Sequence, residues 1–141
     1  MTDGKAFLEQ MFDELINYGK LDAIEQFVDP DYVDHGPLGD VRGIEGFAQL
    51  IAAWREAVPD VHCEVFNVLQ VGDEIAWLVR ATGTHTGDGL GFPATGKGFE
   101  TVSANLGRLR DGKAVEHWSE QGLLPFLVQV GIVPPPGPPP G

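Results

Sequence analysis

The sequence lacks most of the features that mark the commonest classes of binding protein. It has one cysteine, Cys63, so no disulfide can form within the chain and a reducing compartment is expected. No run approaches the ~20 apolar residues that span a bilayer, and residues 1–5 do not resemble a secretory signal. Basic residues are scarce, with 9 Lys and Arg against 21 Asp and Glu and a formal net charge of −12. This charge opposes binding to nucleic acid or to a membrane surface, and we expect a soluble, cytoplasmic protein.

Motifs for bound metals and cofactors are also missing. The sequence has no phosphate-binding loop, no dinucleotide-binding glycine pattern and no Gly-x-Ser-x-Gly turn. Its 4 histidines have neither the i, i+4 helical spacing nor the cysteine neighbours of a metal site. A lone cysteine in an apolar strand, such as Cys63, usually serves packing. Two possibilities remain: acid–base chemistry with no cofactor and no metal, or plain binding of a ligand.

Hydrophobic spacing predicts helices in the first part of the chain and strands in the second. Helices are expected over residues 5–18, 21–28 and 44–58, and strands over 32–35, 61–71, 74–86, 99–109 and 115–120. The stretch 123–133 fits either a short helix or an edge strand. We expect one domain, 1–133, followed by a disordered proline-rich tail, 134–141. The fold class is α+β, with three N-terminal helices packed on a strongly curved mixed or antiparallel sheet that encloses a pocket.

The predicted strand at residues 115–120 has no purely apolar face. Alternation places Glu116, Trp118 and Glu120 on one side, and Val115, His117 and Ser119 on the other. Either side holds ionisable groups beside apolar surface, which disfavours their charged form. This strand is therefore a candidate wall for a pocket in which protons are transferred.

Two more histidines are candidates for the site. His35 ends the short strand at 32–35, where it is either an acid–base group at the pocket mouth or a turn residue beside the capping side chain of Asp34. His85 follows Gly83 and is either a site residue or part of a strand with a bulge.

Large side chains on the helices and strands form the predicted apolar wall or core, namely Phe12, Trp54, Trp77 and Trp118. Arg80 is either exposed on a polar face or buried beside a carboxylate. Asn105 shares a face with Thr101 and Ser103, and it either binds a ligand oxygen or faces water.

The order of these motifs resembles the SnoaL-like polyketide cyclases of the NTF2-like superfamily. The resemblance is carried by Tyr32–His35, Gly83–Gly87, Pro93–Gly96, Glu116–Trp118 and the ending Leu123–Gly131. It implies a cone of three helices on a curved sheet and a homodimer formed through that sheet. It also implies an aldol ring closure of a polyketide ester without a cofactor. In that family a carboxylic acid near the end of the last strand is the acid–base group.

The chain departs from the family at that acid. The family's frequent pattern is His-Trp-Asp-x-x-Asp, whereas this chain has Ser119 and Gly122 at the two aspartate positions. We therefore predict that Glu120 is the general acid or base, with His35 as its partner and with His117 and His85 as further candidates. The predicted substrate is a hydrophobic carbonyl compound, which is cyclised or isomerised.

Other functions remain open at this stage. A ketosteroid isomerase-like site expects a tyrosine where Phe12 stands and an acidic base near Asp34 and His35, and only the second is met. A limonene epoxide hydrolase-like site expects an aspartate where Thr82 follows Arg80. A protein that binds a small hydrophobic molecule without catalysis is the main alternative. An interaction module that works through the proline tail is the third.

Overall fold

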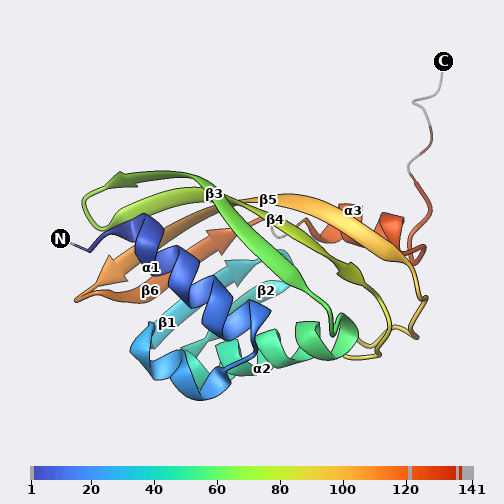
Figure 1. Ribbon diagram of the computed structural model, residues 1–141, viewed down its shortest axis with the longest axis horizontal. Coiled ribbons are helices and arrows are strands. Elements are labelled where there is room, and N and C mark those ends of the chain that lie inside the picture. Colours follow the sequence, from blue (N-terminus) through green and yellow to red (C-terminus); the bar gives the residue numbers. More distant parts are fainter. Residues whose placement is uncertain (1, 121, 136, 138–141) are drawn as a thin grey trace.

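The computed structural model describes residues 2–120, 122–135 and 137. Its strands form a six-stranded open sheet in the order β2-β1-β6-β5-β4-β3. The sheet curves over the helices in Figure 1, with α1 and α2 on its inner side and α3 at one end. The strands are β1 (Val28–Gly36), β2 (Gly39–Arg42), β3 (His62–Val71), β4 (Glu74–Thr84), β5 (Gly98–Arg110) and β6 (Lys113–Ser119). The predicted α+β fold with a curved mixed sheet is thus confirmed.

The pairing of β1 with β6 makes the sheet mixed. These two strands run parallel, whereas β3, β4, β5 and β6 pair in antiparallel succession. The tight turn between β5 and β6 contains Asp111 and Gly112, both with positive φ. This arrangement places residues from near the start and the end of the chain side by side at the centre of the sheet.

The region 29–42 differs most from the sequence prediction. We expected a loop around a brief strand, but β1 runs for 9 residues and returns as β2 through a hairpin at Pro37 and Leu38. Its density of Asp, Gly and Pro favours a loop when the residues are considered alone. Pairing with β6 supplies the hydrogen bonds that keep the segment extended.

The helices follow the predicted periodicity with one change in winding. Helix α1 (Gly4–Met11) begins after Asp3, whose side chain accepts a hydrogen bond from the backbone of Ala6, and continues as the π-helical segment η1 (Phe12–Asn17). A 3-10 segment, η2 (Leu21–Gln26), and helix α2 (Gly43–Ala57) follow. Helix α3 (Leu123–Gln129) adds a further helix and resolves the C-terminal stretch as helical.

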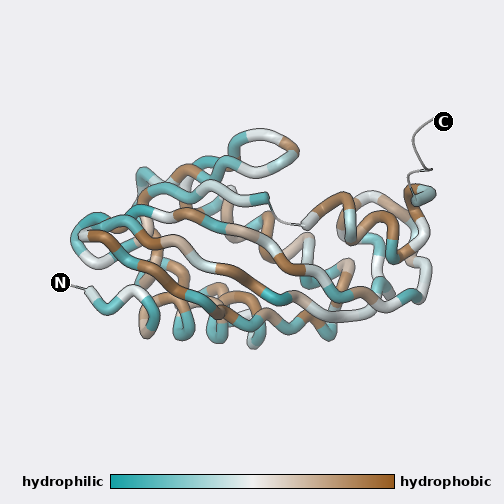
Figure 2. The backbone as a smooth tube through the Cα atoms, turned by 90° about the horizontal axis from the view of Figure 1, so that it is seen from above, coloured by the Kyte–Doolittle hydropathy of each residue, from teal (hydrophilic) through white to brown (hydrophobic). Residues whose placement is uncertain are grey.

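The core fills the space between the sheet and the helices. The main cluster contains Leu8, Leu15, Ile51, Ile75 and Trp77, which come from α1, η1, α2 and β4. A second cluster surrounds Phe126 of α3, which is 1% exposed. Hydrophobic and hydrophilic stretches alternate along the strands and helical turns in Figure 2. Alternate residues along each strand therefore point to two different faces of the sheet. The helices α1 and α2 cover the inner face, and the described part of the chain places no helix over the outer face.

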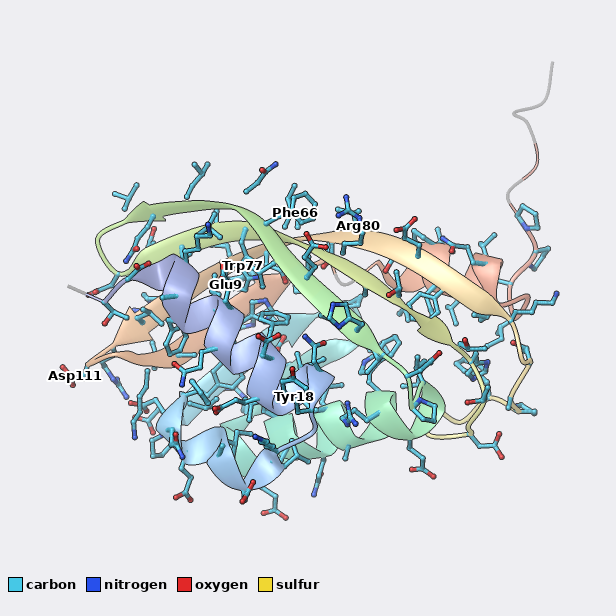
Figure 3. All side chains as sticks on the ribbon, in the orientation of Figure 1. Glu9, Tyr18, Phe66, Trp77, Arg80 and Asp111 are labelled. Atoms are coloured by element: carbon cyan, nitrogen blue, oxygen red, sulfur yellow. The ribbon has the colours of Figure 1, made fainter. Side chains whose placement is uncertain are left out.

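Three labelled side chains distinguish these faces. Figure 3 shows Phe66 and Arg80 pointing away from the helices, while Trp77 lies between the sheet and α1. The guanidinium of Arg80 lies 4.8 Å from the centre of the Phe66 ring. Among the described residues, no helix is both long and apolar enough to cross a membrane. The predicted tail falls largely on residues 136 and 138–141, outside the described part.

Candidate functional site

A cavity of about 170 Å³ lies between the helices and the inner face of the sheet. Apolar side chains of α1, η1 and α2 form one wall, including the predicted Phe12 and Trp54. The polar lining comes mainly from β1, β5 and β6, and includes Asp34, Thr101, Ser103, Asn105, His117 and Ser119, together with Tyr32, Arg55, Arg108 and Glu116. An apolar chamber with a few convergent polar groups is the usual form of a small-molecule site.

Asp34 of β1 and His117 of β6 form the centre of the polar wall. The parallel pairing sets these residues side by side, and Oδ2 of Asp34 lies 3.0 Å from Nδ1 of His117. The exposed side-chain fraction is 2% for Asp34 and 15% for His117. A carboxyl group and an imidazole are thus paired in a place from which most water is excluded.

Tyr32 supports the carboxyl group of Asp34 from the same strand. Its hydroxyl donates to Oδ2 of Asp34 over 3.0 Å. Burial, and then the charge and hydrogen bond of Asp34, raise the pKa of Tyr32 well above its ordinary value. The phenol therefore stays protonated and remains a donor to the carboxyl group.

Asn105 and Ser103 of β5 determine which nitrogen of His117 carries hydrogen. The amide Nδ2 of Asn105 lies 3.3 Å from the main-chain oxygen of Ser103, which can only accept. The amide oxygen of Asn105 therefore faces Nε2 of His117, 2.9 Å away, and accepts its hydrogen. The other ring nitrogen, Nδ1, then faces Oδ2 of Asp34.

One oxygen of Asp34 is left over from these contacts. Its Oδ1 is buried and has no hydrogen-bond partner among the described residues, whereas both nitrogens of His117 are engaged. An unpaired buried acceptor costs roughly 1–3 kcal/mol. Such a group in a cavity wall is suited to contact a ligand.

A second histidine–carboxylate pair occupies the outer face of the same two strands. His35 lies 2.8 Å from both Glu116 and Asp40, and its ring stacks on Trp118 at 5.3 Å. Hydrogen bonds to Glu116 and then Asp40 raise the pKa of His35, while the bond from His35 lowers the pKa of Glu116. Arg108 also pairs with Glu116. His35, Asp40 and Trp118 are outside the described lining of the cavity, whereas Glu116 and Arg108 also border it.

Five residues predicted for the site lie outside the described lining of the cavity: Glu120, His35, Arg80, Trp118 and His85. Glu120 follows the end of β6 and is exposed. Arg80 lies within 3.8 Å of Glu64 and 3.7 Å of Glu100 on the outer face. Trp118 is 40% exposed on that same face. His85 is buried in the second cluster, against Phe126.

The position of Glu120 outside the described cavity lining gives no support to the acid–base role predicted from the sequence. Alternation along β6 turns His117 and Ser119 inward, and the side chain of Glu120 has no place in the cavity from which to reach a ligand. His35 also faces outward and does not partner Glu120. Among the predicted catalytic residues, the structure places only His117 in the cavity wall.

Cys63 of β3 lines the cavity but has the properties of a packing residue. Burial raises the pKa of its thiol to about 12, so the reactive thiolate is scarce at neutral pH. The side chain of Asn17 bonds to both main-chain groups of Cys63 and ties η1 to the edge of the sheet. Within the described ranges, no three His, Cys, Asp or Glu side chains are grouped so that they could hold a metal ion.

Asp34 is not among the catalytic residues predicted from the sequence. There it is a turn cap beside His35, or the position of the acidic base that a ketosteroid isomerase-like site expects. Alternation in Tyr32–His35 signals that Tyr32 and Asp34 share a face, but the partner His117 is 83 residues away. Only the parallel pairing of β1 with β6 brings the two groups together.

Comparisons with known proteins agree with this fold. Residues 6–130 match the family described as SnoaL-like polyketide cyclase. The chain is 30% identical over 122 residues to aklanonic acid methyl ester cyclase DnrD of Streptomyces peucetius, covering 84% of both proteins. It is 30% identical to nogalonic acid methyl ester cyclase of Streptomyces nogalater, covering 77% of this chain and 85% of the relative. The structure of IdmH from Streptomyces antibioticus superposes with a TM-score of 0.79 at 31% identity, covering 92% of this chain and 99% of IdmH.

Proposed function

The chain belongs to the SnoaL-like polyketide cyclase family, and we propose from this premise that it closes a ring in a hydrophobic carbonyl compound by acid–base chemistry with Asp34 as the proton-transferring group. The observation that carries the proposal is the buried Oδ1 of Asp34, which lacks a partner in the described part of the chain. The other oxygen of the carboxyl group is held by Tyr32 and His117. Asp34 would take the role that the family gives to the acid at the end of the last strand.

The proposed reaction is an intramolecular aldol addition. Oδ1 of Asp34 removes a proton from a carbon next to a carbonyl group, and the electron pair of that C–H bond moves into an enolate. The enolate carbon then attacks a second carbonyl carbon of the same molecule, which forms the new C–C bond and an alkoxide. The alkoxide takes the proton back from Asp34. The product is an isomer of the substrate, so no atom or electron is left over.

His117 has a supporting part in this scheme. Its Nδ1 hydrogen bond holds Oδ2 of Asp34, and Asn105 holds the ring in one orientation. A proton shared between Asp34 and His117 keeps the pair close to neutral, which suits a cavity lined mainly by apolar side chains. Positioned acid–base groups of this kind contribute typically 10²–10⁴-fold to rates.

The cavity has to widen when such a substrate enters. Its volume of about 170 Å³ is smaller than the ~300–1,000 Å³ of most ligand sites. The apolar side chains of α1, η1 and α2 that form the opposite wall are the groups that must move. Met11, with an adaptable side chain, belongs to this wall.

The relatives suggest the first assay. Aklanonic acid methyl ester and nogalonic acid methyl ester, which appear in the names of the relatives, should be incubated with the protein and ring closure followed by liquid chromatography. Asp34→Asn should lower the rate by about 10²-fold or more. Asp40→Asn is the matched control, since it changes a carboxylate that pairs with the outer histidine His35 and lies outside the described lining of the cavity, and it should keep the wild-type rate. Equal rates in the wild type and Asp34→Asn would overturn the proposal.

A binding protein without catalysis is the second candidate. The observation that favours it is the presence of Ser119 and Gly122 at the family's aspartate positions. In that case either ester would bind, displace a fluorescent hydrophobic probe from the cavity and be recovered unchanged. Both variants would then bind it with nearly the same affinity as the wild type.

We also propose that two copies associate through the outer face of the sheet. Val102, Leu106 and Trp118 are 51%, 40% and 40% exposed on this face and would be covered in a dimer. Sedimentation velocity at micromolar concentration tests this, and Leu106→Lys should shift the distribution toward the monomer. A monomeric wild type would contradict it.

A further inference from the structure

Trp77 of β4 has a buried donor that no described residue uses. The residue is 5% exposed and lines the cavity, and its indole Nε1 has no hydrogen-bond partner among the described residues. A buried tryptophan N–H is usually paired, because an unmade hydrogen bond in an apolar place is costly. In Figure 3 Trp77 lies between the sheet and α1. The N–H group therefore calls for an acceptor that comes from outside the described chain.

The position of the indole ring is fixed by its neighbours. Its plane stacks on the ring of His117 at 5.4 Å and 13°, and Phe12 packs edge-on against it at 6.4 Å. Strand β5 lies between β4 and β6 in the sheet, so the ring must cross β5 to reach His117. It does so at Gly107, which is paired with His117.

Gly107 makes this crossing possible through its missing side chain. A Cβ added there would lie 3.0 Å from both Cη2 and Cζ3 of Trp77, tighter than ordinary contact. The backbone of Gly107 does not have the positive φ that would require glycine. Space for the indole is thus the reason that the structure offers for glycine at this position.

We infer that the Nε1–H group of Trp77 donates a hydrogen bond to the ligand's carbonyl oxygen and stabilises that oxygen as it becomes an enolate. The inference rests on the proposed function, since it assigns a donor to the same cavity. Cη2 and Cζ3 belong to the six-membered ring over Gly107, so Nε1 lies in the five-membered ring at the other end of the indole. Asp34 and Trp77 both contact His117 and are its neighbours on two sides.

The two unused atoms define the group that the cavity recognises. Oδ1 of Asp34 accepts and Nε1 of Trp77 donates, so among the described residues the cavity offers a ligand one unused acceptor and one unused donor. The donor fits a carbonyl oxygen, and the acceptor can take an acidic hydrogen. A fixed donor aimed at developing oxyanion charge is among the strongest catalytic devices, and loss of one such donor has cost about 10²–10³-fold in kcat in another enzyme. A hydrocarbon of the same shape would leave both atoms without a partner.

The test uses 2-tetralone, a two-ring ketone with acidic C–H bonds beside its carbonyl group, as the probe. Its carbonyl stretching band should shift to lower frequency when it binds to the wild-type protein. Trp77→Phe keeps an aromatic ring over Gly107 but removes the donor, and should abolish the shift. Trp118→Phe, which makes the same change on the outer face of the sheet, should retain it. A shift of equal size in Trp77→Phe would overturn the inference.

A second variant covers the case in which Trp77→Phe does not fold. Gly107→Ala keeps the N–H group but pushes the indole away from His117, and should reduce the band shift. An unchanged shift would count against the inference. Failure of the proposed function gives a different result. In that case Asp34→Asn would close the ring as fast as the wild type, whether or not the carbonyl band of bound 2-tetralone shifts. In an active protein, Trp77→Phe should lower kcat by about 10²-fold with a smaller change in KM.

Discussion

The same two strands carry two histidine–carboxylate pairs, one on each face of the sheet. Adjacent residues alternate, so β1 turns Asp34 inward and His35 outward, while β6 turns His117 inward and Glu116 outward. The contact distances are similar, at 3.0 Å for the inner pair and 2.8 Å for the outer pair. Geometry of the pair alone therefore does not separate a candidate catalytic group from a surface ion pair.

Surroundings separate the two pairs. The outer side chains, His35 and Glu116, are 29% and 22% exposed, and Arg108 and Asp40 share their charge. The inner pair contacts Tyr32, Asn105 and Trp77 in a cavity with an apolar wall, and Asp34 keeps one oxygen unpaired. Neighbouring charges surround the outer pair, whereas we propose that a ligand completes the inner pair.

The largest expected difference between the two faces is in the reactivity of a thiol. Cys63 borders the cavity with a pKa of about 12, against an ordinary value of 9.0. Its thiolate fraction near neutral pH, and hence its alkylation by iodoacetamide, should be about 10³-fold below that of an exposed cysteine. The matched control is Val102→Cys in a Cys63→Ser background, which puts the thiol on the outer face. Comparable alkylation rates by mass spectrometry would show that the cavity is open to water.

Replacing each histidine by glutamine compares the two pairs themselves. His117→Gln removes the imidazole that holds Asp34 and should reduce turnover by about 10²-fold, because the carboxyl group loses its partner. His35→Gln removes the outer imidazole and should change turnover by less than about twofold. Steady-state kinetics on the same ester measures both. A larger loss in His35→Gln than in His117→Gln would reverse the roles given to the two faces.

Tyr32→Phe tests the hydrogen bond to the inner carboxyl group with a smaller expected effect. The variant removes only the hydroxyl that donates to Oδ2 of Asp34. A hydrogen bond to a charged group contributes roughly 1.5–3 kcal/mol, so a drop in kcat of about tenfold or more is expected. Tyr18→Phe is the control, since Tyr18 is 68% exposed. Equal kcat values for the two variants would remove Tyr32 from the mechanism.

The smallest effect is expected from the pH dependence of the outer pair. The pKa of His35 is raised above 6.5, so its stabilisation is complete below that pH and is lost as the pH rises through the folded-state pKa. The pKa of Glu116 is lowered below 4.5, so its contribution is lost as the pH falls through its folded-state value. Wild type and His35→Gln should therefore differ more in urea midpoint near pH 6 than near pH 9. A titration of His35 by NMR with a midpoint below 6.5 would contradict the assignment.

Sequence periodicity predicted most of the helices and strands, and it predicted which residues of β6 share a face. It did not show which of the two faces is the inner one, because that depends on pairing between β1 and β6. For the same reason Glu120 was a reasonable choice for the acid, while Asp34 was taken for a turn residue. Gly107 did offer a signal, since glycine inside a strand indicates a close approach by another group.

Hydrogen exchange in 2-tetralone tests the claim that Asp34 transfers protons in the cavity. The ketone is dissolved in D₂O with the wild type, Asp34→Asn or Asp40→Asn, and loss of its proton signals beside the carbonyl group is followed by NMR. The wild type and Asp40→Asn should accelerate exchange equally, and Asp34→Asn should slow it by about 10²-fold relative to them. Equal exchange with Asp34→Asn, or a matching loss in Asp40→Asn, would contradict the separation of the two faces.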